Sequence, residues 1–217
     1  MPAMLPAETA APAERFAGKG LAAVRGDCLL FKGLHFQLDG GEALVLRGTN
    51  GSGKTTLMKI MAGLTAPLAG EIAWGGTPLA AQPERHRMRI GLIGHRAGLK
   101  EDLSVRECLQ FEAGLRGAGA SEVAAASERL GLTALQALPL RFLSAGQRRR
   151  VALARLAMHG PELWLLDEPA TALDSAGKTA LWQLCRDRLK RGNRLVIASH
   201  GPVPLEAASL AIGRFAP

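Results

Sequence analysis

Short apolar runs alternate with longer segments of helical periodicity along most of the chain. A run that is apolar at nearly every position is typical of a buried strand, whereas apolar residues every three or four positions indicate a helix. The alternation of the two patterns predicts an α/β fold with a mostly parallel core sheet. We expect strands at 21–24, 36–38, 42–47, 71–74, 89–94, 163–167, 194–199 and 209–215, and helices at 54–64, 144–159 and 176–191.

Two regions depart from this alternation. The stretch 96–150 is helical in pattern and holds no strand candidate, so we expect it to form a helical sub-domain inserted into the sheet. Residues 1–18 are rich in Ala and Pro, which predicts a disordered tail before a single domain over 19–217. No run approaches 18 uninterrupted apolar residues, so the chain is not expected to cross a membrane by itself.

The composition of the chain limits the classes of function that we expect. Aromatic residues make up only 4% of the chain, which argues against an aromatic platform for single-stranded nucleic acid. The formal charge of +8 is compatible with an anionic membrane surface, with nucleic acid, or with a polyanionic ligand. The three cysteines are far apart and form no CxxC pair, so a zinc site is not expected.

The stretch 48–56, GTNGSGKTT, lies between a predicted strand and a predicted helix and contains GxxxxGK[ST] in full. Glycines let successive N–H groups turn toward phosphate oxygens, and the helix adds the positive end of its dipole. The Lys54 charge suits the β- and γ-phosphates of a nucleotide, and the Thr55 hydroxyl can ligate Mg²⁺. The residues expected to contact the phosphates are Gly48, Thr49, Asn50, Gly51, Ser52, Gly53, Lys54, Thr55 and Thr56.

A second motif follows at 163–169, LWLLDEP, where a buried strand ends in acidic residues. Asp167 would stand at the carboxyl edge of the sheet, where α/β folds bind ligands, and would hold Mg²⁺ through water. Glu168 is placed to orient and deprotonate an attacking water. The segment LSAGQ at 143–147 precedes a predicted helix, and Gln147 lies 16 residues before Leu163.

The ordered set GTNGSGKT, LSAGQ, LWLLDEP, TALD and His200 resembles that of ABC-type ATPases over roughly residues 20–215. The resemblance implies a P-loop NTPase fold with an antiparallel β portion near the N-terminus. It also implies a head-to-tail homodimer with ATP between the P-loop of one copy and LSAGQ of the other. The nucleotide contacts of that second segment would come from Ser144, Ala145, Gly146 and Gln147, the first three of which open a helix.

Other roles are also implied by the resemblance. Asp174 of TALD would carry a dimer contact, and His200 would reach the γ-phosphate and the attacking water. Members of the family usually place an aromatic residue against adenine, and here that position falls near Arg25. Arg25 could stack on the base or be an ordinary surface arginine.

His95 stands where most members have a glutamine whose carbonyl serves Mg²⁺ or the attacking water. A neutral His could offer a ring nitrogen there, or it could be a tolerated replacement without chemistry. The GH pair, with LFKGLHFQLDGGEALVLRGTNGSGKTTLMKIMAGL, is similar to the ATP-binding subunits of the haem exporter of cytochrome c maturation.

That similarity implies integral membrane partner subunits and a peripheral position at the cytoplasmic face of the bacterial inner membrane. It favours a membrane partner over nucleic acid. An ATPase of another small-substrate exporter, a soluble ABC protein that acts on nucleic acid or ribosomes, and a module that holds ATP without hydrolysis are the alternatives. The chain has no CxxCH, and a haem pocket cannot be identified from its residues.

Overall fold

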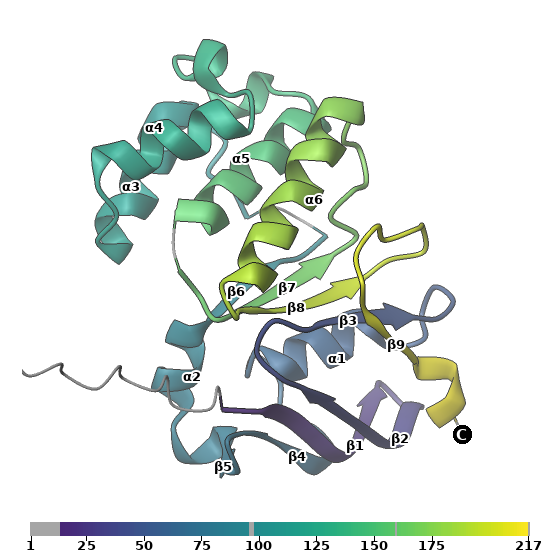
Figure 1. Cartoon of the computed structure of the whole chain (residues 1–217). Coiled ribbons are helices and arrows are strands. Elements are labelled where there is room, and N and C mark those ends of the chain that lie inside the picture. The colour runs from purple at the N-terminus through teal and green to yellow at the C-terminus, as the bar shows by residue number, and fades with distance from the viewer. Residues whose placement is uncertain (1–13, 96–97, 159, 217) are drawn as a thin grey trace, which may run out of the picture.

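The computed structural model describes residues 14–95, 98–158 and 160–216, which form two sheets with helices against the larger one (Figure 1). The smaller sheet is antiparallel wherever its strands pair and has the order β2-β1-β4-β5. This sheet confirms the expected antiparallel portion near the N-terminus. Its strands are β1 (Phe16–Arg25), β2 (Cys28–Leu38), β4 (Ala69–Trp74) and β5 (Thr77–Pro78).

The larger sheet has the order β6-β7-β8-β3-β9, and each pair of neighbours is parallel. The predicted α/β fold with a parallel core sheet is therefore confirmed. The strands are β3 (Ala43–Arg47), β6 (Ile90–Ile93), β7 (Leu163–Asp167), β8 (Arg194–Ala198) and β9 (Ala208–Ala211).

Both faces of this core sheet are buried, and β7 shows how. Leu163 and Leu165 belong to the hydrophobic cluster shared with the antiparallel sheet and α1 (Lys54–Met61). Trp164 and Leu166 belong to the cluster on the other face, shared with α5 (Ala145–Met158) and α6 (Ser175–Lys190). Since burial of one such side chain stabilises a fold by about 1.5–3 kcal/mol, the apolar residues at the first four positions of β7 hold the two layers together.

The helices α3 (Val105–Arg116) and α4 (Ala120–Arg129) lie between β6 and β7 in the chain and gather at one end of the molecule (Figure 1). Their buried side chains join the same cluster as α5, α6 and the core sheet. The described part of 96–150 is thus packed continuously with the rest, and its division as a sub-domain remains a prediction.

Several features differ from the sequence expectations, among them β2, which begins at Cys28 rather than at residue 36. The strand β1 begins at Phe16, which is fully buried, so 16–18 belong to the sheet rather than to the predicted tail; residues 1–13 lie outside the described residues. The predicted strand 209–215 is strand only to Ala211. Helix α2 (Pro83–Arg89) was not expected, because PERHRMR has no apolar face at helical spacing. The 3₁₀ helices are η1 (Leu79–Ala81), η2 (Thr133–Leu135), η3 (Leu140–Phe142) and η4 (Ile212–Phe215).

The single buried residue of α2 is His86, which joins three elements. Its Nδ1 accepts a hydrogen bond from Trp74 Nε1 at 2.8 Å, and its Nε2 lies 2.7 Å from the Met61 carbonyl oxygen. Both contacts are hydrogen bonds only if the ring is neutral with its proton on Nε2. Burial lowers the pKa of His86 from its ordinary value of 6.5, and the nearby charges of Arg89 and Arg87 also lower the pKa.

This arrangement predicts a loss of stability on acidification. The unfolded chain binds a proton on His86 near pH 6.5, whereas the folded chain resists protonation until a lower pH. The free energy of unfolding should therefore fall as the pH drops below about 6.5, by up to about 1.4 kcal/mol per pH unit from this one group. Urea denaturation at pH 7.5 and 5.5 would measure the loss. The His86→Gln variant, neutral at both pH values, should lose less; an equal loss would contradict the assignment.

Candidate active site

The carboxyl ends of four neighbouring parallel strands bring the predicted motifs to one edge of the core sheet. The loop 48–53 follows β3, Asp167 ends β7, His200 follows β8, and His95 follows β6. This is the edge at which open α/β sheets bind their ligands.

The loop 48–53 has the backbone shape that its glycines allow. Gly53 caps α1 with φ of 99°, a left-handed conformation, and a Cβ there would lie 3.1 Å from the buried Phe31 ring. A Cβ at Gly48 would lie 2.4 Å from the Ser52 hydroxyl oxygen. The first turn of α1 contains no acidic residue, so the positive end of the helix is left for an anion.

Lys54 folds back over this loop. Its Nζ donates to the carbonyl oxygens of Gly48 at 2.8 Å and Thr49 at 2.9 Å, and it lies 3.2 Å from His200 Nε2. The Ser52 hydroxyl oxygen is buried and has no hydrogen-bond partner within the described ranges. Because a buried polar atom is normally hydrogen-bonded, the unpaired hydroxyl fits a site whose remaining acceptor is a phosphate oxygen.

Thr55 and Asp167 meet at the floor of the site, where the Thr55 hydroxyl donates to Asp167 Oδ2 at 2.9 Å. Within residues 14–95, 98–158 and 160–216, no group of three or more His, Cys, Asp or Glu side chains could hold a metal ion. The two oxygens fit Mg²⁺, which proteins usually bind through one or two side chains while phosphates and water complete the shell.

Glu168 has φ of 46°, a left-handed conformation that costs a residue other than glycine about 1–3 kcal/mol. Its N–H donates to the Ala198 carbonyl at 2.9 Å, and its Oε1 accepts from the His200 N–H at 3.0 Å. His200 Nε2 lies 3.7 Å from the same Oε1. The carboxylate and the imidazole thus face one another beside the Lys54 ammonium group.

The LSAGQ segment begins α5 with a capping box. The Ser144 hydroxyl accepts from the Gln147 N–H at 3.2 Å, and the Gln147 side chain accepts from the Ser144 N–H at 2.8 Å. The N–H groups of Ala145 and Gly146 stand in the first turn, where a helix leaves its donors unpaired. In the described part of the chain, no hydrogen bond or ion pair joins this segment to the loop 48–53 of the same copy.

The segment 171–174 packs directly on LSAGQ. A Cβ at Gly146 would lie 2.4 Å from the Ala172 carbonyl oxygen, so only glycine allows this approach. Asp174 caps α6 by accepting from the Gly177 N–H at 2.8 Å, and it pairs with Arg150. These two contacts lower the pKa of Asp174 and keep it ionised.

In the described part of the chain, no hydrogen bond or ion pair joins His95 or Arg25 to Thr55 or Asp167. His95 is exposed and lines a groove of about 570 Å³ with residues of α5 and of 171–172. Arg25 is exposed at the end of β1. Their roles toward Mg²⁺ and adenine therefore remain predictions.

Sequence reasoning missed Arg149, which is buried and donates to backbone carbonyls at the ends of β6 and β7. It also missed Arg47, whose guanidinium donates to the carbonyls of Ser199 and Gly201 on either side of His200. The run RRR at 148–150 gave no sign of this burial, since three charges in a row on a helix are typical of a solvated face.

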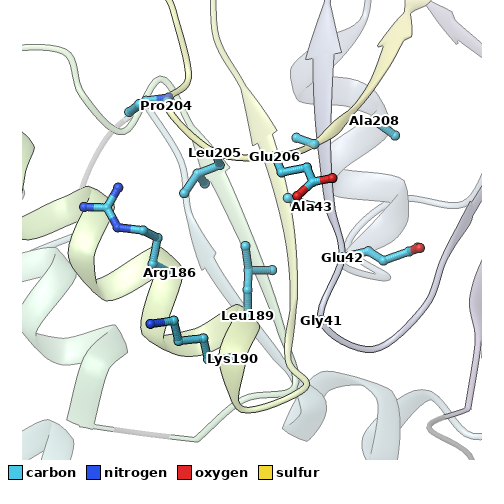
Figure 2. Close-up of a pocket in the computed structure, with 11 residues that line it drawn as sticks. Gly41, Glu42, Ala43, Arg186, Leu189, Lys190, Pro204, Leu205, Glu206 and Ala208 are labelled. Carbon is cyan, nitrogen blue, oxygen red and sulfur yellow. The ribbon is translucent and has the colours of Figure 1, made fainter.

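A larger basin of about 790 Å³ lies at the opposite end of the core sheet and contains none of these motif residues. Figure 2 shows Arg186, Leu189 and Lys190 of α6 on one side of it and Glu206 on the other. Its floor includes the start of β3, so it is separated from the site by the length of the strands.

Among the described residues, no helix has the length and apolar character needed to span a membrane. Solved structures confirm the fold. A putative ABC transporter ATP-binding protein from Pyrococcus furiosus superposes with a TM-score of 0.82 at 24% identity, over 94% of this chain and all of that one.

The model of the ABC transporter family matches residues 31–171. The cytochrome c biogenesis ATP-binding export protein CcmA of Rhodospirillum rubrum is 44% identical over 203 residues, which cover 93% of this chain and 87% of that protein. The CcmA protein of Hyphomonas neptunium is 45% identical over 192 residues, which cover 88% and 93%. The chain therefore belongs to the ATP-binding proteins of the ABC transporter family and, within them, to the CcmA proteins.

Proposed function

We propose that the chain is the ATP-hydrolysing subunit of a haem-export transporter in cytochrome c biogenesis and drives integral membrane partner subunits. The observation that carries the proposal is the meeting of Lys54, Asp167 and Glu168 at one sheet edge in a chain 44% identical to a cytochrome c biogenesis export protein. In this proposal the protein is peripheral, at the cytoplasmic face of the inner membrane.

Within the site, the phosphates of ATP would lie on the N–H groups of 48–53 and at the start of α1. Lys54 would exchange its loop carbonyls for the β- and γ-phosphates, and the unpaired Ser52 hydroxyl would donate to a phosphate oxygen. Thr55 and Asp167 would hold Mg²⁺, which supplies positive charge to the phosphate oxygens.

The hydrolytic step would use Glu168 and His200. The Glu168 carboxylate takes a proton from a water whose oxygen attacks the γ-phosphorus. The bond from that phosphorus to the bridging oxygen breaks, and its electron pair leaves with ADP. The backbone N–H of His200 is bonded to the Glu168 carboxylate, and its imidazole would donate to the γ-phosphate or the water.

A second copy would complete the site. The first-turn N–H groups of Ala145 and Gly146 would form an anion site, and within the described residues LSAGQ makes no hydrogen bond to the loop 48–53 of its own copy. A head-to-tail homodimer would place them against the γ-phosphate held by the other copy. Asp174, beside them in 171–174, would then stand at the contact between copies.

We expect Glu168→Gln to bind ATP but to hydrolyse it at least about 10²-fold more slowly, because an amide cannot take the proton from water. The variant should also accumulate as an ATP-bound dimer, seen by gel filtration with and without ATP. Wild-type protein measured in parallel is the control, and near-normal turnover by the variant would remove Glu168 from this role.

Lys54→Ala should weaken ATP binding at least about tenfold, since a charge-assisted contact to phosphate contributes about 1.5–3 kcal/mol. Calorimetric titration with ATP measures the change, and thermal melting checks that the variant is folded. Lys59→Ala, which changes an exposed lysine further along α1, is the matched control and should bind ATP normally. Equal affinity of all three proteins would contradict the phosphate site.

The groove between His95 and α5 is the proposed docking surface for the membrane partner, together with the described part of 96–135. Arg96 lies outside the described residues, so the test uses Lys100, which is exposed beside the groove residue Leu99. Lys100→Glu should lower co-purification with the partner subunits from membranes and leave the ATPase rate of the isolated protein unchanged.

The matched control is Lys190→Glu, which reverses the same charge at the basin of Figure 2 and should leave attachment intact. Equal recovery of partners by wild type, Lys100→Glu and Lys190→Glu would place docking elsewhere.

Mass spectrometry of the co-purifying integral subunits tests haem export itself: subunits of another exporter would overturn it.

A further inference from the structure

The Arg149 guanidinium contacts the backbone of Glu168 but takes no direct part in the proposed hydrolytic step. Arg149 lies one turn into α5, is 7% exposed, and sits where α5, β6 and β7 meet. Its Nη1 donates to the Gly94 carbonyl at 2.9 Å, and its Nη2 donates to the carbonyls of Asp167 at 3.1 Å and Glu168 at 3.0 Å. One side chain therefore binds three backbone carbonyls from two strand ends.

The two contacts of Nη2 flank the Cα atom of Glu168. The carbonyls of Asp167 and Glu168 belong to the two peptide planes whose relative rotation defines φ and ψ of Glu168. A single nitrogen bound to both oxygens keeps them close together and so limits that rotation. Glu168 has a positive φ that residues other than glycine rarely adopt. Strained conformations of this kind persist where surrounding contacts over-determine them.

The contact of Nη1 ties the same group to the residue before His95. Since the guanidinium is planar and rigid, the three carbonyls are held in one geometry that a flexible ammonium group could not reproduce. Burial lowers the pKa of Arg149, whereas the charges of Asp167 and Glu168 raise it. Arg149 thus links the helix that begins at LSAGQ to the turn that presents Glu168.

We infer that Arg149 is a positioning residue for ATP hydrolysis, which sets the backbone conformation of Glu168 and fixes it relative to α5 and the end of β6. The inference rests on the proposed role of Glu168. Arg149 lies outside the phosphate-binding loop, so its loss should change turnover and leave the binding of ATP largely intact.

The test compares Arg149→Met with Arg188→Met. Arg188 is 8% exposed, lies on α6 and also donates to a backbone carbonyl, that of Pro161, away from the site. Both variants lose a buried guanidinium, so both should melt at a lower temperature than wild type. Only Arg149→Met should lower kcat, by about 10- to 100-fold as expected for a misplaced catalytic group, with KM for ATP within about threefold.

Two further variants keep the inference open to refutation if Arg149→Met folds poorly. Arg149→Lys keeps the cation but not the fork, and should have an intermediate kcat. Arg149→Ala should regain part of its kcat when millimolar guanidinium is added, whereas Glu168→Gln should not. A kcat for Arg149→Lys and Arg149→Ala equal to that of Arg188→Met, or a loss confined to KM, would overturn the inference.

Glu168→Gln assayed in the same series separates the two proposals. If Glu168→Gln hydrolyses ATP normally, the proposed role of Glu168 fails, and with it the reason to position it. If Glu168→Gln is inactive while Arg149→Met and Arg149→Ala keep wild-type kcat, only the positioning inference fails.

Discussion

The register between three parallel strands is the constraint on which the site depends. Ala198 of β8 is the partner of Leu46 of β3 on one side and of Asp167 of β7 on the other. These three residues form one row across the sheet. The phosphate-binding loop starts two residues after Leu46, His200 lies two residues after Ala198, and Glu168 follows Asp167 directly. A shift of one residue in either pairing would turn every side chain of the shifted strand to the other face and separate the groups.

The apolar strands protect this register from both sides. In β7 and β8, alternate residues enter different hydrophobic clusters, so a slip in either strand would exchange the contents of two cores at once. The glycine-rich loop and the left-handed Glu168 are locally unfavourable, and they persist because the strands that precede them are held so firmly. The stability of the sheet therefore offsets the strain at its carboxyl edge.

Two buried arginines connect neighbouring elements through hydrogen bonds to backbone carbonyls. Arg194 is 2% exposed, donates to the Leu38 carbonyl at 3.2 Å and lies 4.9 Å from the Trp74 ring centroid, joining the core sheet to the antiparallel sheet. Arg149 makes the corresponding joint between α5 and the carboxyl ends of β6 and β7. A buried guanidinium is costly unless its donors are used, so each of these residues requires the backbone carbonyls around it to stay in place.

The sequence could predict what local pattern determines. The loop 48–56, the strand ending in Asp167 and the helix after LSAGQ are each encoded by contiguous residues, and their order along parallel strands implies that they meet at one edge. The burial of Arg149 could not be predicted, because its acceptors come from strand ends 55 and 18 residues away in the chain. Helix α2 was missed for a related reason: its polar residues form a helix because His86 reaches Trp74 and Met61.

A single copy of the chain holds only part of the proposed ATP site. Two helices begin with N–H groups suited to an anion: α1, which receives the loop 48–53, and α5, which begins at LSAGQ. The first is joined to Asp167 through Thr55, and the second to the same strand end through Arg149. In the proposed dimer, each nucleotide would bind α1 of one copy and α5 of the other. Movement of the two copies toward each other would then reach Glu168 through the bonds of Arg149 to the Asp167 and Glu168 carbonyls, which already exist within each chain. No new contact to the Glu168 carboxylate would be needed.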